Sequence, residues 1–415
     1  MNNTLILLTN YYPFFKGEEY LETEIDYLSS EFEKIIIFPT MASNKMKINR
    51  PLPSNVQVVN IDIDLSRGKK IQLISKTKMY INKEFKQILK EEKHLSIINK
   101  LYSTYFEARS NYVYSKITKE LNKINFSGKK VTIYSYWFYV TARVAVSLKN
   151  KYFKDKDIYT VSRAHRYDLY ENEAPLKFLP HRNYLLKNLD QVFPCSQNGA
   201  EFLTNNYPIY KDKIEVKRLG TTKQNIKVKK PKQCFRIVTC SALRKVKRVD
   251  MLVDALEELD INKINYEWVH IGSGTEFDKI KSKAEKQLNR KNYKFLGSLK
   301  NKEVIKWYKQ NDVSVFVNLS SSEGVPVSIM EAMSLGIPVI ATDVGGTKEL
   351  VRDKVNGFLL NQYCNKSDVA NTLIKFYQLE DNVEEKMRQS ALNMWIQSCD
   401  AEKLYKEFAM MLRVS

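Results

Sequence analysis

The amino-acid sequence predicts an α/β protein made of two Rossmann-like domains. Its 415 residues exceed what one ordinary hydrophobic core contains, so two domains are expected. Apolar strand-like runs alternate with helical segments, which is the pattern of a parallel sheet covered by helices. The pattern begins twice, before and after a lysine-rich stretch at residues 223–233. We therefore expect two doubly wound domains that face each other across a cleft.

The first predicted domain covers residues 1–222. It opens with the apolar strand TLILLT, a polar loop through Gly17, a helix over residues 19–32 and a second strand, KIIIFP. Residues 66–130 contain 16 Lys and Arg but only 5 Asp and Glu. They are predicted to form basic helices, because cationic and apolar residues alternate there at helical spacing. Strand-like runs then return as KVTIYSYW, DIYTVSRAH and QVFPCS.

The second predicted domain covers residues 234–390. The stretch before it, KQNIKVKKPKQ at 223–233, shows no strand or helix pattern and is predicted to be the inter-domain linker. The domain begins with the strand FRIVTCSAL and a helix near residues 249–259, and continues through YEWVHIGSG, YKFLGSL, VSVFVNLS and VIATD. The run GSG lacks the full G-x-G-x-x-G spacing, so it indicates a tight turn rather than a phosphate loop. Several helices close the chain.

The composition is that of a globular protein with a large excess of positive charge. Hydrophobic residues make up 43% of the chain, and 67 Lys and Arg outnumber 47 Asp and Glu, which gives a formal net charge of +20. Such a charge suits a polyanion, an anionic membrane surface or an acidic substrate. Scattered lysines that only keep the protein soluble would also explain it.

The cysteines and the N-terminus predict a cytoplasmic protein. The five cysteines are far apart and form no C-x-x-C pair, which indicates free thiols in a reducing compartment rather than disulfides or a zinc site. The N-terminus lacks the basic region of a signal peptide, and no run of 18 apolar residues predicts a transmembrane helix. The cysteines are Cys195, Cys234, Cys240, Cys364 and Cys399.

The stretch SSSEGVPVSIMEAMSLGIPVIATDVGG, residues 320–346, carries the strongest functional signal. The preceding run DVSVFVNLS is a buried strand, and SSSEGV is the loop at its carboxyl end. Pro326 is expected at the start of the next helix, because proline lacks a backbone N–H and the first N–H of a helix has no partner within the helix. The helix should run to about Leu335, since Gly336 can adopt the left-handed cap and Pro338 prevents continuation.

A helix in this position points its positive N-terminus at whatever binds beyond the strand, which makes a ready phosphate site. Gly324 lets a ligand approach the backbone closely, and free N–H groups are expected at residues 325–328. Glu323 can accept hydrogen bonds from sugar hydroxyls, and Glu331 can bind a ribose diol. Either glutamate alone could be an acidic residue favoured by the helix dipole. Their combination with the strand, the glycine and the proline predicts a ligand site.

Four segments resemble the motifs of family 4 glycosyltransferases, which are retaining enzymes of GT-B fold. EGVPVSIMEAMSLGIPVIATDVGG is similar to the nucleotide-sugar signature of that family, and SALRKVKRVDMLVDAL to its donor-diphosphate loop. NYYPFFKGEEYLETEI resembles the acceptor-side loop of polysaccharide-assembling members, and VSRAHRYDLY their central histidine segment. The resemblance covers essentially the whole chain. It implies the GT-B fold, with residues 391–415 forming a helix that packs back on the N-terminal domain.

The resemblance also implies the donor-binding residues. Glu323 would contact the transferred sugar, Glu331 the nucleoside ribose and Lys247 the diphosphate, where a cation stabilises the leaving group. The family usually has an arginine where this chain has Ala242, so Arg244 or Arg248 would supply that charge, unless these cations are only solvated. The remaining donor-side residues are Gly17, Gly324, Val325, Pro326, Val327 and Ser328.

His165 matches the active-site histidine of the family, near the donor sugar. Asp168 would orient His165 or an acceptor hydroxyl. A lone histidine is more often structural, and Gly17 could be an ordinary turn glycine, so these alternatives stay open. No His/Cys cluster with metal-ligand spacing is present in the sequence, so we expect a metal-independent enzyme without a cofactor, in which cations and the helix dipole stand in for a divalent ion.

Together the patterns and the resemblance predict a hexosyltransferase-type enzyme, and the resemblance implies that it is retaining. It would move a sugar from a UDP- or GDP-linked donor to a polyprenyl-diphosphate-linked oligosaccharide for capsule, O-antigen or exopolysaccharide. The basic helices at 66–130 would suit an anionic leaflet, which places the enzyme at the inner face of the cytoplasmic membrane. A nucleotide-sugar 2-epimerase of the same fold is the nearest alternative. A nucleic-acid-binding protein is less favoured, and no nucleic-acid partner is expected, because no recognised module is present.

Overall fold

The computed structural model describes residues 3–14, 17–63, 68, 72, 83–92, 95–126, 129–231 and 233–414. These form two compact units, Met1–Leu219 with Glu402–Ser415, and Gly220–Ala401, called unit 1 and unit 2 below. Much of the first part of the predicted basic region 66–130 lies outside the described residues. Among those that are described, no helix is both long and apolar enough to cross a membrane.

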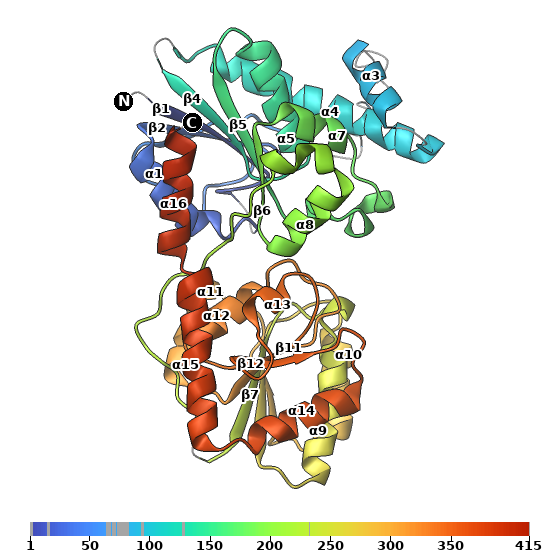
Figure 1. Cartoon of the computed structure of the whole chain (residues 1–415), viewed down its shortest axis with the longest axis vertical. Helices are drawn as coiled ribbons and strands as arrows, with labels where there is room; N and C mark the ends of the chain where they lie inside the picture. Colours follow the sequence, from blue (N-terminus) through green and yellow to red (C-terminus); the bar gives the residue numbers. More distant parts are fainter. Residues whose placement is uncertain are drawn as a thin grey trace. The chain divides into compact units, whose positions relative to one another are not determined.

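Unit 1 is built on a six-stranded parallel sheet with the strand order β3-β2-β1-β4-β5-β6 (Figure 1). Every residue of β1 is buried, because helices cover both faces of a parallel sheet and a continuous apolar run such as LILL suits that position. Leu5 pairs with Ile35 of β2 and with Thr132 of β4. The strands are β1 (Asn3–Thr9), β2 (Lys34–Pro39), β3 (Val56–Val58), β4 (Lys130–Ser135), β5 (Ile158–Ala164) and β6 (Gln191–Pro194).

The helix α16 (Ala401–Val414) completes one face of this unit, beside α1 and the first strands. Phe408 and Leu412 are buried in the same core cluster as β1 and α1, and the Leu412 carbonyl accepts a hydrogen bond from Thr132 Oγ1 at 3.1 Å. The other helices of unit 1 are α1 (Leu21–Glu31), α3 (Lys83–Glu91), α4 (Ile97–Leu121), α5 (Val140–Ser147), α6 (Arg166–Leu169), α7 (Arg182–Asn188) and α8 (Gln197–Asn206).

The segment 391–415, expected as one helix, contains parts of two. The helix α15 (Asp381–Ser398) ends where the Cys399 carbonyl accepts the N–H of Thr221, and α16 begins where the N–H of Ala401 donates to the Thr221 carbonyl. Backbone groups that would continue the helix are therefore used by a neighbouring segment instead.

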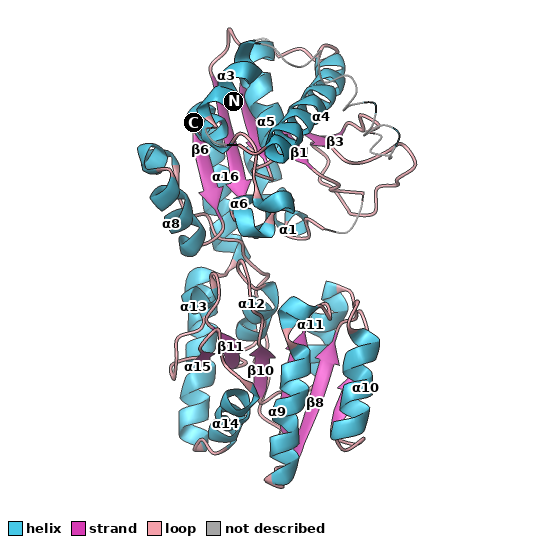
Figure 2. Ribbon diagram, turned by 90° about the vertical axis from the view of Figure 1, so that its right-hand side faces the viewer, coloured by secondary structure: helices cyan, strands magenta, loops and turns pink. Residues whose placement is uncertain are grey.

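Unit 2 repeats the architecture of unit 1, with the strand order β12-β11-β10-β7-β8-β9. The arrows of β8 and β10 point the same way in Figure 2, as the parallel register requires. The strands are β7 (Phe235–Cys240), β8 (Tyr266–Ile271), β9 (Tyr293–Phe295), β10 (Val315–Asn318), β11 (Val339–Thr342) and β12 (Gly357–Leu360). The remaining helices are α9 (Val249–Ile261), α10 (Phe277–Gln287), α11 (Asn301–Gln310), α12 (Val327–Ser334), α13 (Thr347–Leu350) and α14 (Lys366–Tyr377).

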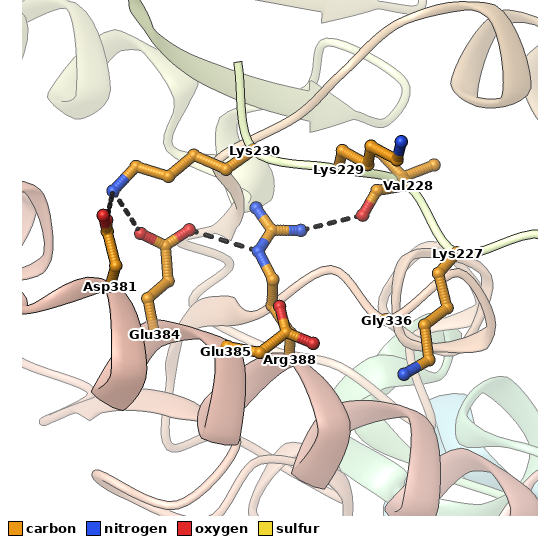
Figure 3. A pocket seen from close by; sticks show the side chains of 9 residues that line it. All are labelled: Lys227, Val228, Lys229, Lys230, Gly336, Asp381, Glu384, Glu385 and Arg388. Atoms are coloured by element: carbon orange, nitrogen blue, oxygen red, sulfur yellow. Dashed lines mark hydrogen bonds and ion pairs between the residues drawn. The ribbon is translucent and has the colours of Figure 1, made fainter. Parts of the chain in front are cut away.

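The predicted linker at 223–233 is a strap fastened to unit 2. The N–H of Val228, a buried residue, donates to the Leu335 carbonyl at 2.9 Å, and the Lys229 carbonyl accepts the N–H of Val313 at 2.9 Å. Arg388 Nη1 donates to the Val228 carbonyl at 3.1 Å (Figure 3). The sequence pattern predicted only a linker without strand or helix, but the Val228 side chain is buried and the backbone groups around it find partners in the folded unit.

A cavity of about 510 Å³ lies between this strap and α15. Three of its charged groups form a chain of ion pairs: Lys230 Nζ lies 2.7 Å from Glu384 Oε2, and Glu384 Oε1 accepts from Arg388 Nε at 3.1 Å. Lys229, which lines the cavity, binds Val313 through its carbonyl, and Val313 comes shortly before β10. The cavity is therefore at the amino-terminal end of that strand. The predicted ligand loop follows the same strand, so the cavity belongs to the opposite edge of the sheet.

Candidate active site

The strand order of unit 2 reverses between β7 and β10. At such a switch point, the loops leaving neighbouring carboxyl ends diverge and leave a crevice that binds ligands in doubly wound folds. The loop after β7 contains a short helical turn, Lys245–Lys247, and the loop after β10 contains Glu323. The sequence therefore folds so that the predicted diphosphate and sugar residues meet at the switch point.

Lys247 and Glu323 form an ion pair there. Lys247 Nζ lies 2.6 Å from Glu323 Oε1, and the two side chains are 24% and 9% exposed. The same oxygen accepts hydrogen bonds from Ser320 Oγ at 2.6 Å and from Asn318 Nδ2 at 3.3 Å. Because three donors meet Oε1, the carboxylate is held in one orientation.

Neighbouring loops hold the backbone around Glu323 in place. The N–H of Ser321 donates to the Val246 carbonyl at 2.8 Å, and the N–H of Gly346 donates to the Gly324 carbonyl at 2.8 Å. Gly345, at φ +54°, lies so close that a Cβ there would be 1.9 Å from the Glu323 carbonyl oxygen. The motif EG and the later motif GG are therefore parts of one packed structure.

We expect Gly345→Ala to damage this site. A methyl group at Gly345 must displace the Glu323 backbone, so unit 2 should lose more than the roughly 1 kcal/mol that a side chain at positive φ costs alone. Gly297→Ala is the matched control, because Gly297 has φ +71° but nothing within 4 Å of the new Cβ. Thermal unfolding of both variants checks the prediction, and equal losses of stability would contradict it.

The N-terminus of α12 faces the same crevice. Pro326 is the N-cap residue, and its side chain accepts no hydrogen bond. The first N–H groups of the helix, at Val327 and Ser328, therefore receive no side-chain cap from it. Both residues and Val325 are partly exposed. Uncapped N–H groups and the positive end of the helix dipole attract anions. Gly336 ends the helix at φ +71°, which confirms the predicted left-handed cap.

Glu331 lies within α12 and is 7% exposed. Asn301, the first residue of α11, donates its side-chain N–H to Glu331 Oε1. Burial raises the pKa of Glu331 to about 7, although the hydrogen bond from Asn301 opposes the shift. The carboxyl group therefore changes its charge near neutral pH, and the charged form is the one that accepts two hydroxyl donors.

The cations expected to replace the missing arginine have different surroundings. The Arg248 guanidinium is used by the fold, since it donates to the carbonyls of Leu319 at 2.6 Å, Gln362 at 2.9 Å and Ser320 at 3.3 Å. Arg244 is exposed at the start of the same turn, and Ala242 is also exposed. Arg244 is therefore the better placed of the two to meet a ligand in solution.

His165 belongs to unit 1, unlike Lys247 and Glu323. Its Nε2 lies 3.0 Å from the Tyr136 carbonyl, and its Nδ1 lies 3.5 Å from Cys195 Sγ. A carbonyl oxygen only accepts, so Nε2 carries the proton and Nδ1 keeps the lone pair. Burial, and then the charge of Arg163, lower the pKa of His165 to about 3, so the ring stays neutral. Its role near the donor sugar stays a prediction.

Asp168 is also in unit 1, three residues after His165. One carboxylate oxygen, Oδ1, accepts the N–H of His165 at 2.6 Å, and Oδ2 accepts the N–H of Phe138 at 2.6 Å. Burial raises the pKa of Asp168 to about 7, against the opposing charge of Arg182. Asp168 thus holds the loops after β4 and β5 together, and the orientation of an acceptor hydroxyl by this residue stays a prediction.

Sequence reasoning missed Glu18, which lies at the switch point of unit 1 between β1 and β4. Its buried carboxylate accepts the N–H groups of Asn10, Tyr11 and Tyr12 at 2.6–2.8 Å and the Trp137 indole N–H at 2.7 Å. The predicted Gly17 precedes it at φ +95°. The only available signal in the sequence was the pair Glu18–Glu19 after Gly17. Acidic residues are common at the start of any helix, so this pair did not indicate a special role.

Asn301, Asn318 and Ser320, which bind the two glutamates, were also missed. Asn318 could have been noticed, because a polar residue ending an apolar strand lies at the ligand edge of a parallel sheet. Asn301 is far from Glu331 in the sequence and gives no local signal. Among the described residues, no group of three or more His, Cys, Asp or Glu side chains is arranged to hold a metal ion.

Residues 221–394 match the family model described as glycosyl transferases group 1. This chain is 23% identical over 256 residues, 60% of its length, to a glycosyltransferase named for colanic acid biosynthesis, WcaL of Salmonella typhimurium. The match covers 63% of that relative, less than two thirds of its length.

Two solved structures share the fold of this chain along its length. The lipopolysaccharide outer core galactosyltransferase WaaB, in its apo form, has a TM-score of 0.66 at 15% identity and covers 99% of both chains. HepE of Anabaena, in complex with UDP, has a TM-score of 0.63 at 16% identity and covers 100% of both chains. These likenesses show the fold alone, and they confirm the predicted GT-B class of α/β protein.

Proposed function

We propose that this protein is a retaining glycosyltransferase that moves a sugar from a nucleoside diphosphate to a hydroxyl group. The observation that carries the proposal is the Lys247–Glu323 pair at the switch point of unit 2, beside the uncapped N-terminus of α12. A cation and free N–H groups suit a diphosphate. Glu323 Oε2, the oxygen not bound by the three donors, would accept from a sugar hydroxyl, and Glu331 would accept from the ribose.

In the proposed reaction, the bond between the anomeric carbon and the diphosphate oxygen breaks. A new bond forms between the same carbon and the acceptor oxygen, on the face that the diphosphate leaves. The acceptor proton passes to the departing phosphate oxygen, so no other base is needed. Lys247 would stabilise the charge that develops on the diphosphate, and that stabilisation would stand in for a divalent ion.

The proposed acceptor is a polyprenyl-diphosphate-linked oligosaccharide used for a bacterial surface polysaccharide, at the inner face of the cytoplasmic membrane. The names of two similar proteins support this class, since one refers to colanic acid biosynthesis and the other to the lipopolysaccharide outer core. UDP is the first nucleotide to test, because HepE was solved with UDP. GDP is the second.

A thermal-shift screen against UDP, GDP, ADP and CMP, with and without magnesium, tests the proposal. We expect one nucleoside diphosphate to stabilise the protein without magnesium. No shift with any of them would contradict the proposal. A donor sugar that is altered with no acceptor present would favour a 2-epimerase.

The affinity for the stabilising nucleotide is expected to rise with pH. The pKa of Glu331 is about 7, so the carboxylate that binds the diol is mostly protonated at pH 6 and mostly ionised at pH 8. This change corresponds to about a tenfold gain in affinity. Glu331→Gln keeps the shape of the side chain but cannot ionise. The affinity of this variant for the nucleotide should therefore lack the tenfold rise between pH 6 and pH 8. Parallel pH profiles for wild type and variant would contradict the role of Glu331.

A further inference from the structure

Unit 1 exposes an apolar patch on the first turns of α4. The side chains of Ile97, Ile98 and Leu101 are 77%, 61% and 65% exposed, and their spacing places them on neighbouring faces of one helix end. Ser96 caps this helix by accepting the N–H of Asn99 at 3.1 Å, so the turn is formed. Single exposed aliphatic residues are ordinary, but three within five residues of one helix are a patch.

Exposed lysines lie next to this patch. Helix α3 buries Phe85 and Ile88 and exposes Lys83, Lys86 and Lys90, whose spacing places them along one side of the helix. The end of α3 is tied to α4, because Ser103 Oγ donates to Glu92 Oε2 at 3.3 Å. Lys100, within the apolar turn, is exposed as well.

The acidic side chains of the same region are occupied by other partners. Glu84 contacts Lys151 at 2.8 Å and Arg143 at 3.6 Å, and Glu92 also accepts the N–H of His181. Only Glu91 is an exposed acid on α3. Among the described residues, the exposed side chains of α3 and of the first turns of α4 therefore include four lysines, three aliphatic side chains and one glutamate. Figure 1 shows α3 and the beginning of α4 at one edge of unit 1.

We propose that this surface, formed by Lys83, Lys86, Lys90, Ile97, Ile98, Lys100 and Leu101, docks on an anionic lipid bilayer. Lysines are attracted to anionic headgroups, and aliphatic side chains at a helix end enter the interface between headgroups and acyl chains. The aliphatic side chains would enter the bilayer while the lysines of α3 remain at the headgroups. The proposal rests on the proposed function for its biological purpose, since an enzyme that uses a lipid-linked acceptor must meet it at a membrane.

Co-sedimentation of the full chain with vesicles tests the docking surface. We expect binding to phosphatidylcholine vesicles that contain phosphatidylglycerol, weak binding to phosphatidylcholine alone, and weaker binding as salt increases. The Ile97→Ser, Ile98→Ser, Leu101→Ser triple variant should reduce binding about tenfold or more, by loss of the inserted apolar area. Replacing Lys83, Lys86 and Lys90 by glutamine should reduce both the binding and its salt dependence. Ile209→Ser, at a residue 81% exposed elsewhere in unit 1, should change nothing.

Unchanged vesicle binding by the serine triple variant, or equal loss with Ile209→Ser, would overturn the proposal. It would also be overturned if the wild-type chain forms a dimer that the triple variant breaks while neither chain binds vesicles, because a second copy would then cover the patch. Thermal unfolding and nucleotide binding of the same variants separate this result from the proposed function. A protein that binds its nucleotide but no vesicles refutes the docking alone, whereas vesicle binding without nucleotide binding refutes the transferase alone.

Discussion

Lys247→Ala is expected to lower kcat/KM for sugar transfer by about 10²- to 10³-fold, the usual effect of removing one preorganised group that stabilises developing charge. Lys247 Nζ is the only charged donor among the three that bind Glu323 Oε1. Its loss would remove the cation proposed to face the leaving diphosphate and would also release the Glu323 carboxylate. The measurement is the rate of nucleoside diphosphate release from the donor that the nucleotide screen identifies.

Lys245→Ala is the matched control for this experiment. Lys245 belongs to the same short helical turn as Lys247 but is exposed to solvent. It has the same charge, so a general electrostatic effect on an anionic substrate would appear in both variants. Nearly full activity in Lys247→Ala, or an equal loss in Lys245→Ala, would be incompatible with the role proposed for Lys247.

Glu24→Ala is expected to destabilise unit 1 by about 3–5 kcal/mol, because it leaves a buried guanidinium without its counter-charge. The side chains of Arg163 and Glu24 are both 0% exposed, with Arg163 Nη2 3.1 Å from Glu24 Oε2. Burial opposes the charge of Arg163, but the Glu24 carboxylate outweighs it and raises the pKa of the guanidinium. Tyr134 completes the cluster, since its hydroxyl donates to Glu24 Oε1 at 2.9 Å.

Urea unfolding followed by circular dichroism measures this loss of stability. Glu120→Ala is the control, because Glu120 pairs with Lys123 at the surface of the same unit, where the lysine side chain is 68% exposed. Exposed pairs of this kind contribute at most about 1 kcal/mol. If Glu24→Ala costs no more than Glu120→Ala, the buried pair does not have the structural role that its burial indicates.

The parts of the fold that could be predicted from the sequence are those with a local signal. The strand before Glu323 is a largely apolar run, and the helix after it begins beside Pro326 and ends at Gly336. Proline fixes its own φ angle near the helical value, and glycine tolerates the left-handed conformation of a helix cap. The repeated alternation of strands and helices was enough to predict two α/β domains. Periodicity and backbone chemistry act within a few residues, so one sequence is sufficient to detect them.

The contacts that join distant segments could not be predicted in the same way. Val228 binds the predicted linker to the Leu335 carbonyl of unit 2. Glu18 joins the loop after β1 to the Trp137 indole, 119 residues away, and both contacts form only on folding. Asn301 is likewise placed on Glu331 by the packing of two helices. For the candidate site, residue types and spacing indicated Glu323 and Glu331, and the family resemblance indicated Lys247, whereas the groups that orient them needed the structure.

Calorimetric titration of the nucleoside diphosphate into wild-type protein, Lys247→Ala and Lys245→Ala tests most directly whether the switch point of unit 2 is a donor site. The account predicts metal-independent binding to the wild type, a similar affinity for Lys245→Ala and a loss of at least about tenfold for Lys247→Ala, as expected for removal of one charge-assisted contact of about 1.5–3 kcal/mol. Equal affinities for all three proteins, or no binding to the wild type, would contradict it.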